Sequence, residues 1–123
     1  MNVQKSAAPF EYMVLDIKVC GTDARTGKTA VLILFMDWQT GIVFHNLYTT
    51  QTGKGVLVKF LRYISNKYNF GDLKVSYKLI TAFEKPFETV IKMFLKDASE
   101  IIFDPELANA IAEQVRGKFV NMQ

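Results

Sequence analysis

The stretch from Met13 to Tyr48 constrains the fold most, because it reads as three apolar segments separated by two polar turns. In the first segment, Tyr12 to Cys20, side chains alternate between two faces, which is typical of a β-strand. The second, Thr29 to Met36, is apolar after its first residue, which favours a strand covered on both faces. The third, Ile42 to Thr49, follows a short loop. The stretch therefore predicts three antiparallel strands in a meander.

One acid, Asp16, lies in the middle of the first strand and on the same face as Lys18. A carboxylate buried without a partner costs several kcal/mol, so Asp16 needs either a partner or a function. One interpretation is an internal ion pair or hydrogen bond, with Lys18 as the partner. The other is a ligand for a hard cation, because the single Cys20 and the single His45 cannot assemble a site for a softer metal.

At 123 residues, the chain has the size of one domain that buries its own core. Residues 1–9 are small and polar and predict a flexible lead-in, so that residues 10–123 form the single domain. No apolar run reaches the ~18 residues of a membrane span, and the start lacks the apolar core of a signal peptide. These features favour an intracellular, cytoplasmic protein without membrane contact. The formal net charge of +3 permits nucleic-acid binding without requiring it.

The second half of the chain alternates helical and strand patterns. The predicted elements are a helix from Leu57 to Tyr68, a strand from Leu73 to Thr81, a helix from about Pro86, a strand from Glu100 to Phe103, and a last helix after Asp104. The order β-β-β-α-β-α-β-α predicts an α/β fold with a mixed, five-stranded sheet and helices packed on it. The first strand is expected to lie centrally, beside the later, parallel strands.

Four short segments carry a resemblance to a known superfamily. They are Pro9–Ile17, Leu34–Val43, Lys85–Ile91 and Ala98–Pro105. Through them the chain, from Phe10 to Glu106, resembles the ribonuclease-H-like superfamily, and within it the catalytic core of DDE transposases and retroviral-type integrases. The first segment is similar to the strand that carries the family's leading catalytic aspartate. The second is similar to the family's hairpin, where an Asp and then a Gly turn the second strand into the third.

The resemblance implies a domain from a mobile element or virus that acts on DNA with two Mg²⁺ or Mn²⁺ ions, held by three carboxylates. Asp16 matches the first carboxylate and is the expected metal ligand. The family's second aspartate would fall near Ala82, in a strand without an acid, and Glu84 follows two residues later. Glu113, on the last helix, is the third candidate. The expected catalytic set is therefore Asp16, Glu84 and Glu113, in a domain that is catalytically degenerate.

Three basic residues lie on the helix that follows the meander: Lys59 and Arg62 on its polar side, and Lys67 at the edge of that side. They could contact a nucleic-acid backbone, which would make the affinity fall with salt. More often, such a group of charges is simply the solvated side of an amphipathic helix. Tyr63, on the same side, could stack on a base or simply pack at the rim of the core.

A second class of function is a small, non-enzymatic module that binds a protein or forms a homodimer. Its expected surface is the edge of the third strand, near His45 and Trp38. Trp38, at the tip of a hairpin, either folds back onto the sheet or marks a contact surface. A salt-dependent shift of labelled DNA would favour the first class of function, and a dimer without DNA binding the second.

Overall fold

The computed structural model of the protein describes residues 10–50, 55–71 and 76–121, with side chains as far as Val115. Within these residues the elements are β1 (Tyr12–Thr22), β2 (Thr29–Asp37), β3 (Val43–Thr50), α1 (Val56–Tyr68), β4 (Tyr77–Thr81), the short 3-10 helix η1 (Lys85–Phe87), α2 (Glu88–Phe94), β5 (Ala98–Phe103) and α3 (Pro105–Asn121). The predicted α/β class is confirmed. The expected lead-in, 1–9, and the first residues of the expected fourth strand, 73–75, lie outside the described residues.

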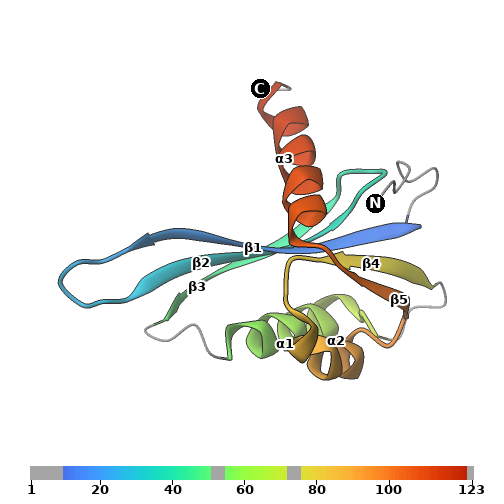
Figure 1. The fold of residues 1–123 in the computed structure, drawn as a ribbon, viewed down its shortest axis with the longest axis horizontal. Helices are drawn as coiled ribbons and strands as arrows, with labels where there is room; N and C mark the ends of the chain where they lie inside the picture. Colours follow the sequence, from blue (N-terminus) through green and yellow to red (C-terminus); the bar gives the residue numbers. More distant parts are fainter. Residues whose placement is uncertain (1–9, 51–54, 72–75, 122–123) are drawn as a thin grey trace.

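The described strands form one mixed sheet in the order β3-β2-β1-β4-β5, with β1 at the centre (Figure 1). β1 runs antiparallel to β2, and β2 antiparallel to β3, so these strands form the predicted meander. On its other side β1 pairs with β4 in parallel, and β4 pairs with β5 in parallel. The parallel connections contain helices because parallel neighbours need a long crossover between them.

The helices cover opposite faces of the sheet: α1 and α2 lie on one face and α3 rises from the other (Figure 1). Side chains of β1 therefore alternate between two clusters. Met13 and Leu15 join the core under α1 and α2, whereas Val14 joins a smaller core under α3. By the same alternation Asp16 points to the α3 side. The core under α3 is completed by residues of β2, β4 and α3 and by Trp38.

Asp37, which is fully buried, holds the turn between β2 and β3. Its carboxylate accepts the backbone N–H of Phe10 at 3.0 Å and the hydroxyl of Thr40 at 2.7 Å. The next residue, Trp38, donates its backbone N–H to the carbonyl of Tyr12 and is only 7% exposed. Trp38 thus folds back onto the sheet, and the alternative in which it marks a contact surface is wrong.

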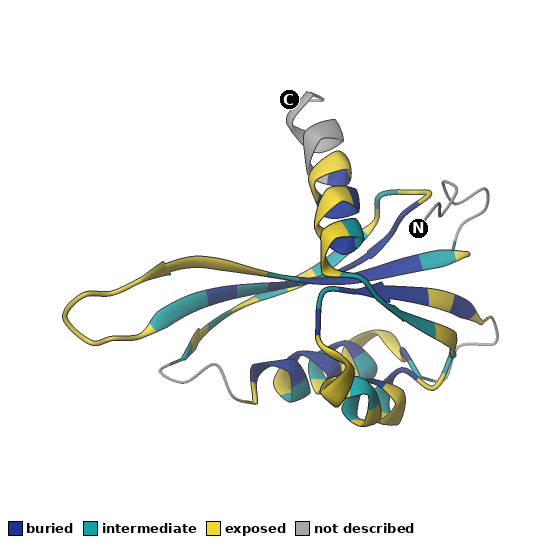
Figure 2. Cartoon of the chain, viewed as in Figure 1, coloured by how far each residue is buried: buried dark blue, intermediate teal, exposed yellow. Residues whose placement is uncertain are grey.

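β1 and β2 extend as a long hairpin beyond the helices, and its outer part is exposed (Figure 2). The predicted end of β1 at Cys20 is two residues early, because a register shift between Val19 and Gly21 lets the strand continue past the glycine. α2 begins after the 3-10 helix that contains Pro86, and Phe87, the last residue of that 3-10 helix, is exposed. Within the described residues, none of the helices combines the length and the apolar character that a membrane span needs.

Candidate functional sites on the two faces of the sheet

The first candidate site is built on Asp16, which β1 carries at the centre of the sheet. Its side chain is only 5% exposed, and its Oδ1 atom has no hydrogen-bond partner among the described residues. Burial raises the pKa of Asp16. The backbone N–H of Ile17 opposes this shift, the negative charge of Glu113 adds to it, and the positive charge of Lys18 opposes it again. Asp16 is therefore a buried acid whose environment disfavours its ionised form.

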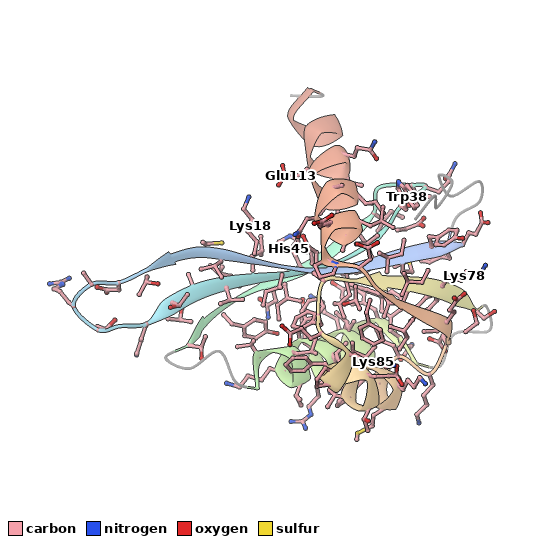
Figure 3. The ribbon with its side chains drawn as sticks, viewed as in Figure 1. Lys18, Trp38, His45, Lys78, Lys85 and Glu113 are labelled. Carbon is pink, nitrogen blue, oxygen red and sulfur yellow. The ribbon has the colours of Figure 1, made fainter. Side chains whose placement is uncertain are left out.

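Lys18 of β1 and Glu113 of α3 point toward one another on the α3 side of the sheet (Figure 3), and the charges of both act on Asp16. The Nζ atom of Lys18 lies 3.9 Å from Oε1 of Glu113. The ion pair that the structure shows for Lys18 is thus with Glu113 and not with Asp16. Both side chains are largely exposed, so this ion pair adds little stability. It does hold the Lys18 ammonium near the carboxyl groups of Glu113 and Asp16.

An alanine occupies the place beside Asp16 where the family resemblance asks for a second acid. Leu15 is paired with Thr81 in the parallel ladder, and the N–H of Ala82 donates to the carbonyl of Leu15 at 3.0 Å. Ala82 packs against the core under α3, so it lies on the same face as Asp16.

Glu84 is exposed and precedes η1. Among the described residues, no three side chains of His, Cys, Asp or Glu gather closely enough to hold a metal ion. The structure thus brings Asp16 and Glu113 together but does not bring Glu84 to them. With an alanine beside Asp16 and the Lys18 ammonium next to Glu113, these donors do not fit the pair of divalent ions that the resemblance implies.

The second candidate site lies on the opposite side of the sheet, on the outer surface of α1 (Figure 2). Lys59, Arg62 and Lys67 are all exposed there. Because α1 covers the face that α3 does not, these cations and Asp16 belong to two different surfaces. A single ligand-binding site cannot include both sets without extending around the edge of the sheet.

Lys67 is held by two tyrosines. Its Nζ donates a hydrogen bond to the hydroxyl of Tyr63 at 3.2 Å, and it lies 5.3 Å and 5.4 Å from the ring centres of Tyr63 and Tyr68. The two rings meet edge to face, with centres 6.2 Å apart. The hydrogen bond from Lys67 lowers the pKa of Tyr63, and the bond to Tyr63 raises the pKa of Lys67, so the lysine keeps its charge.

β3 contributes a third tyrosine to this region. Tyr48 accepts a hydrogen bond from the side-chain amide of Asn46 at 3.2 Å. Burial raises the pKa of Tyr48, the Asn46 bond lowers it, and the charge of the Tyr63 phenol raises it again; Tyr48 and Tyr63 both pack against the core under α1. We call Tyr48, Tyr63 and Tyr68 the tyrosine cluster. Sequence reasoning singled out only Tyr63 of this cluster.

One sequence signal points to the whole surface. Residues 38–71, which include β3 and α1, contain no Asp and no Glu, although the chain has 12 acids in total. The same residues contain Lys54, Lys59, Arg62 and Lys67. Such segregation of charge leaves the exposed side of α1 positive, and it could have been read before the fold was known.

Compared with known proteins, the chain matches no family model, no curated protein and no solved structure. Its function therefore has to be inferred from these two surfaces.

Proposed function

We propose that this chain is a ribonuclease-H-like domain, similar to a transposase or integrase core of a mobile element or virus, that binds nucleic acid in the cytoplasm without cutting it. The central place of β1, with antiparallel neighbours on one side and parallel ones on the other, supports the ribonuclease-H-like assignment. So does the acid that β1 carries on the face of α3. The observation that carries the binding function is the exposed, acid-free surface of α1, with Lys59, Arg62 and Lys67.

The absence of cutting is part of the proposal and rests on the donor set beside Asp16. Two-metal cleavage needs carboxylates that bridge and position both ions. Ala82 supplies no oxygen beyond its backbone, and Lys18 brings a positive charge to the place that the ions would share. Both features act against the assembly of a metal pair.

Binding is tested by fluorescence anisotropy of a labelled DNA oligonucleotide at several salt concentrations. The wild-type affinity should fall with salt, because each phosphate contact releases counterions. The double variant Lys59→Glu/Arg62→Glu should bind roughly tenfold or more weakly at low salt, with a salt slope smaller by about two. The matched control Lys28→Glu/Lys85→Glu makes the same change of charge at two exposed residues outside α1 and should bind like the wild type.

Three results would contradict the proposal. If the wild type does not bind DNA at low salt, or if the control variant loses as much affinity as the α1 variant, the α1 surface is not the binding site. If the wild type nicks supercoiled plasmid with Mn²⁺ and Asp16→Asn abolishes the nicking, the domain is an active nuclease. Melting temperatures of both double variants establish that they are folded.

A homodimer through β3 is the second candidate function, and one observation favours it. β3 is an edge strand of the described sheet, and its Leu47 is 58% exposed. At this strand the side-chain Oδ1 of Asn46 accepts the N–H of Leu47 at 3.0 Å, and a pairing strand would have to replace that bond. Light scattering after size-exclusion chromatography would show a dimer, which Leu47→Lys should dissociate. A dimer that binds no DNA at low salt would favour this function over the first.

A further inference from the structure

The arrangement around Lys67 is suited to a planar ligand with a negative charge beside it. No carboxylate of the described residues pairs with Lys67, whose ammonium group instead rests against two phenol rings and one hydroxyl. These contacts hold the cation over the two rings without neutralising it. An incoming phosphate therefore would not have to displace an acid before it could bind the lysine.

Aromatic residues of the core also fix the orientation of the Tyr68 ring. Tyr68 packs against Phe44 of β3, with ring centres 4.6 Å apart, and against Phe70, with centres 6.4 Å apart. Phe70 in turn lies edge to face with the buried Phe35. Tyr68 is nevertheless 37% exposed. A ring that is fixed by the core and still open to solvent loses little conformational entropy when a flat group stacks on it.

The other two cations of α1, Lys59 and Arg62, lie on the same helix as Tyr63 and Tyr68. Arg62 precedes Tyr63 directly, and Lys59 lies one helical turn, about 6 Å, before it. Aromatic rings beside a row of cations are the combination that holds single-stranded nucleic acid, with bases on the rings and phosphates on the cations. A duplex keeps its bases stacked on one another, so it would leave Tyr63 and Tyr68 without a partner.

We infer that the ligand of the α1 surface is a single strand, whose bases stack on Tyr63 and Tyr68 while Lys67, Arg62 and Lys59 contact its phosphates. The inference rests on the proposed nucleic-acid binding and narrows its ligand. Base stacking on an aromatic ring tolerates any base, so the binding is expected to depend on strandedness and salt more than on sequence.

The test compares a labelled 12-nucleotide oligothymidine with a 12-base-pair duplex by fluorescence anisotropy. The wild type should bind the single strand about tenfold or more tightly than the duplex. Tyr63→Leu should remove most of this preference and leave the salt slope unchanged, because it removes a ring and no charge. Tyr63→Phe keeps the ring and should bind the single strand like the wild type. Lys59→Glu/Arg62→Glu should instead reduce the slope for both probes.

A matched control is available on the α3 side of the sheet, where the ammonium of Lys78 lies 5.7 Å from the ring centre of Tyr12. Tyr12→Leu removes an equivalent tyrosine beside a lysine and should not change the preference for the single strand. As an independent measurement, ultraviolet crosslinking of an oligonucleotide that carries 5-iodouridine should attach it to Tyr63 or Tyr68, as located by mass spectrometry.

The outcomes separate this inference from the proposal on which it rests. Equal affinity for the two probes, an unchanged preference in Tyr63→Leu, or crosslinks confined to the α3 side of the sheet would overturn stacking while leaving nucleic-acid binding in place. Absence of binding to either probe at low salt would overturn both. Melting temperatures and the retained affinity of Tyr63→Phe exclude misfolding as the cause of any loss.

Discussion

At the scale of single residues, Asp16 is an acid in a buried position that lowers the stability of the fold at neutral pH. In the unfolded chain, Asp16 has the ordinary pKa of 3.8 and loses its proton above that pH. In the folded protein the pKa is raised, so the proton is kept to a higher pH. The contribution of this group to stability is therefore complete below pH 3.8 and is lost as the pH rises through the raised pKa. At neutral pH the buried carboxylate weakens the fold, which is why a functional origin for it deserves a test.

Asp16→Asn should consequently stabilise the protein at neutral pH, by an amount on the order of 1 kcal/mol, because it removes a buried charge and keeps the shape of the side chain. The gain in stability should shrink as the pH falls toward 3.8, because the folded wild type then also has an uncharged side chain at position 16. Urea unfolding of both proteins between pH 3.5 and 8 measures this difference. A loss of stability at neutral pH would show instead that the ionised carboxylate is well compensated, for instance by Lys18.

Ala82 allows the opposite experiment, in which a carboxylate is added. Ala82→Asp places a second acid next to Asp16, so the variant should be less stable than the wild type by about 1–2 kcal/mol without metal, through repulsion and burial. Mn²⁺ should then raise its melting temperature, because two adjacent carboxylates offer a hard cation its preferred oxygens.

The control for this experiment is Ala82→Asn, which has nearly the same size and no charge. Mn²⁺ should leave the melting temperatures of this control and of the wild type unchanged. If the cation stabilises Ala82→Asp no more than the control, then position 82 does not face the space beside Asp16 in solution.

At the scale of elements, the beginning of α3 follows directly from local sequence. Asp104 precedes Pro105 and Glu106 of the first turn, and its Oδ1 caps the helix by accepting the N–H of Leu107 at 3.0 Å. This cap orients the helix that carries Glu113 across from Lys18. Asp104→Ala should destabilise the protein by about 1 kcal/mol, measured by urea unfolding, whereas Asp104→Asn keeps an acceptor and should cost less. Equal losses in the two variants would argue against capping as the role of Asp104.

Other features of the same elements could be predicted only in part, for physical reasons. Strand alternation predicted that Asp16 and Lys18 share a face, because it depends on backbone geometry alone. The partner of Lys18 could not be predicted, because Glu113 approaches only when α3 packs on that face. Likewise, the helical period placed Lys67 at the edge of the polar side of α1, but its contact with Tyr68 depends on how the end of α1 packs against Phe44.

At the scale of the whole molecule, the sheet separates the two candidate sites. Lys18 and Glu113 lie on the side of α3 (Figure 3), and the alternation of β1 places Asp16 there too, whereas the basic, tyrosine-lined surface lies on the side of α1. The sequence resemblance joined them in one function, since it implied acids and DNA contacts in a single catalytic core. The structure instead places the two surfaces on opposite faces of one sheet, each over its own core.

This separation predicts that the two surfaces respond independently to mutation. Asp16→Asn should leave the affinity for single-stranded DNA unchanged, and Lys59→Glu/Arg62→Glu should leave the pH dependence that comes from Asp16 unchanged. In the combined triple variant the changes in binding and in stability should each equal the sum of the separate effects to within about 0.5 kcal/mol, because the sites share no contacts. Anisotropy and urea unfolding measure the two quantities on the same samples. A severalfold loss of affinity from Asp16→Asn alone would mean that the nucleic acid reaches around the sheet to the α3 side, and that Asp16 belongs to the binding surface after all.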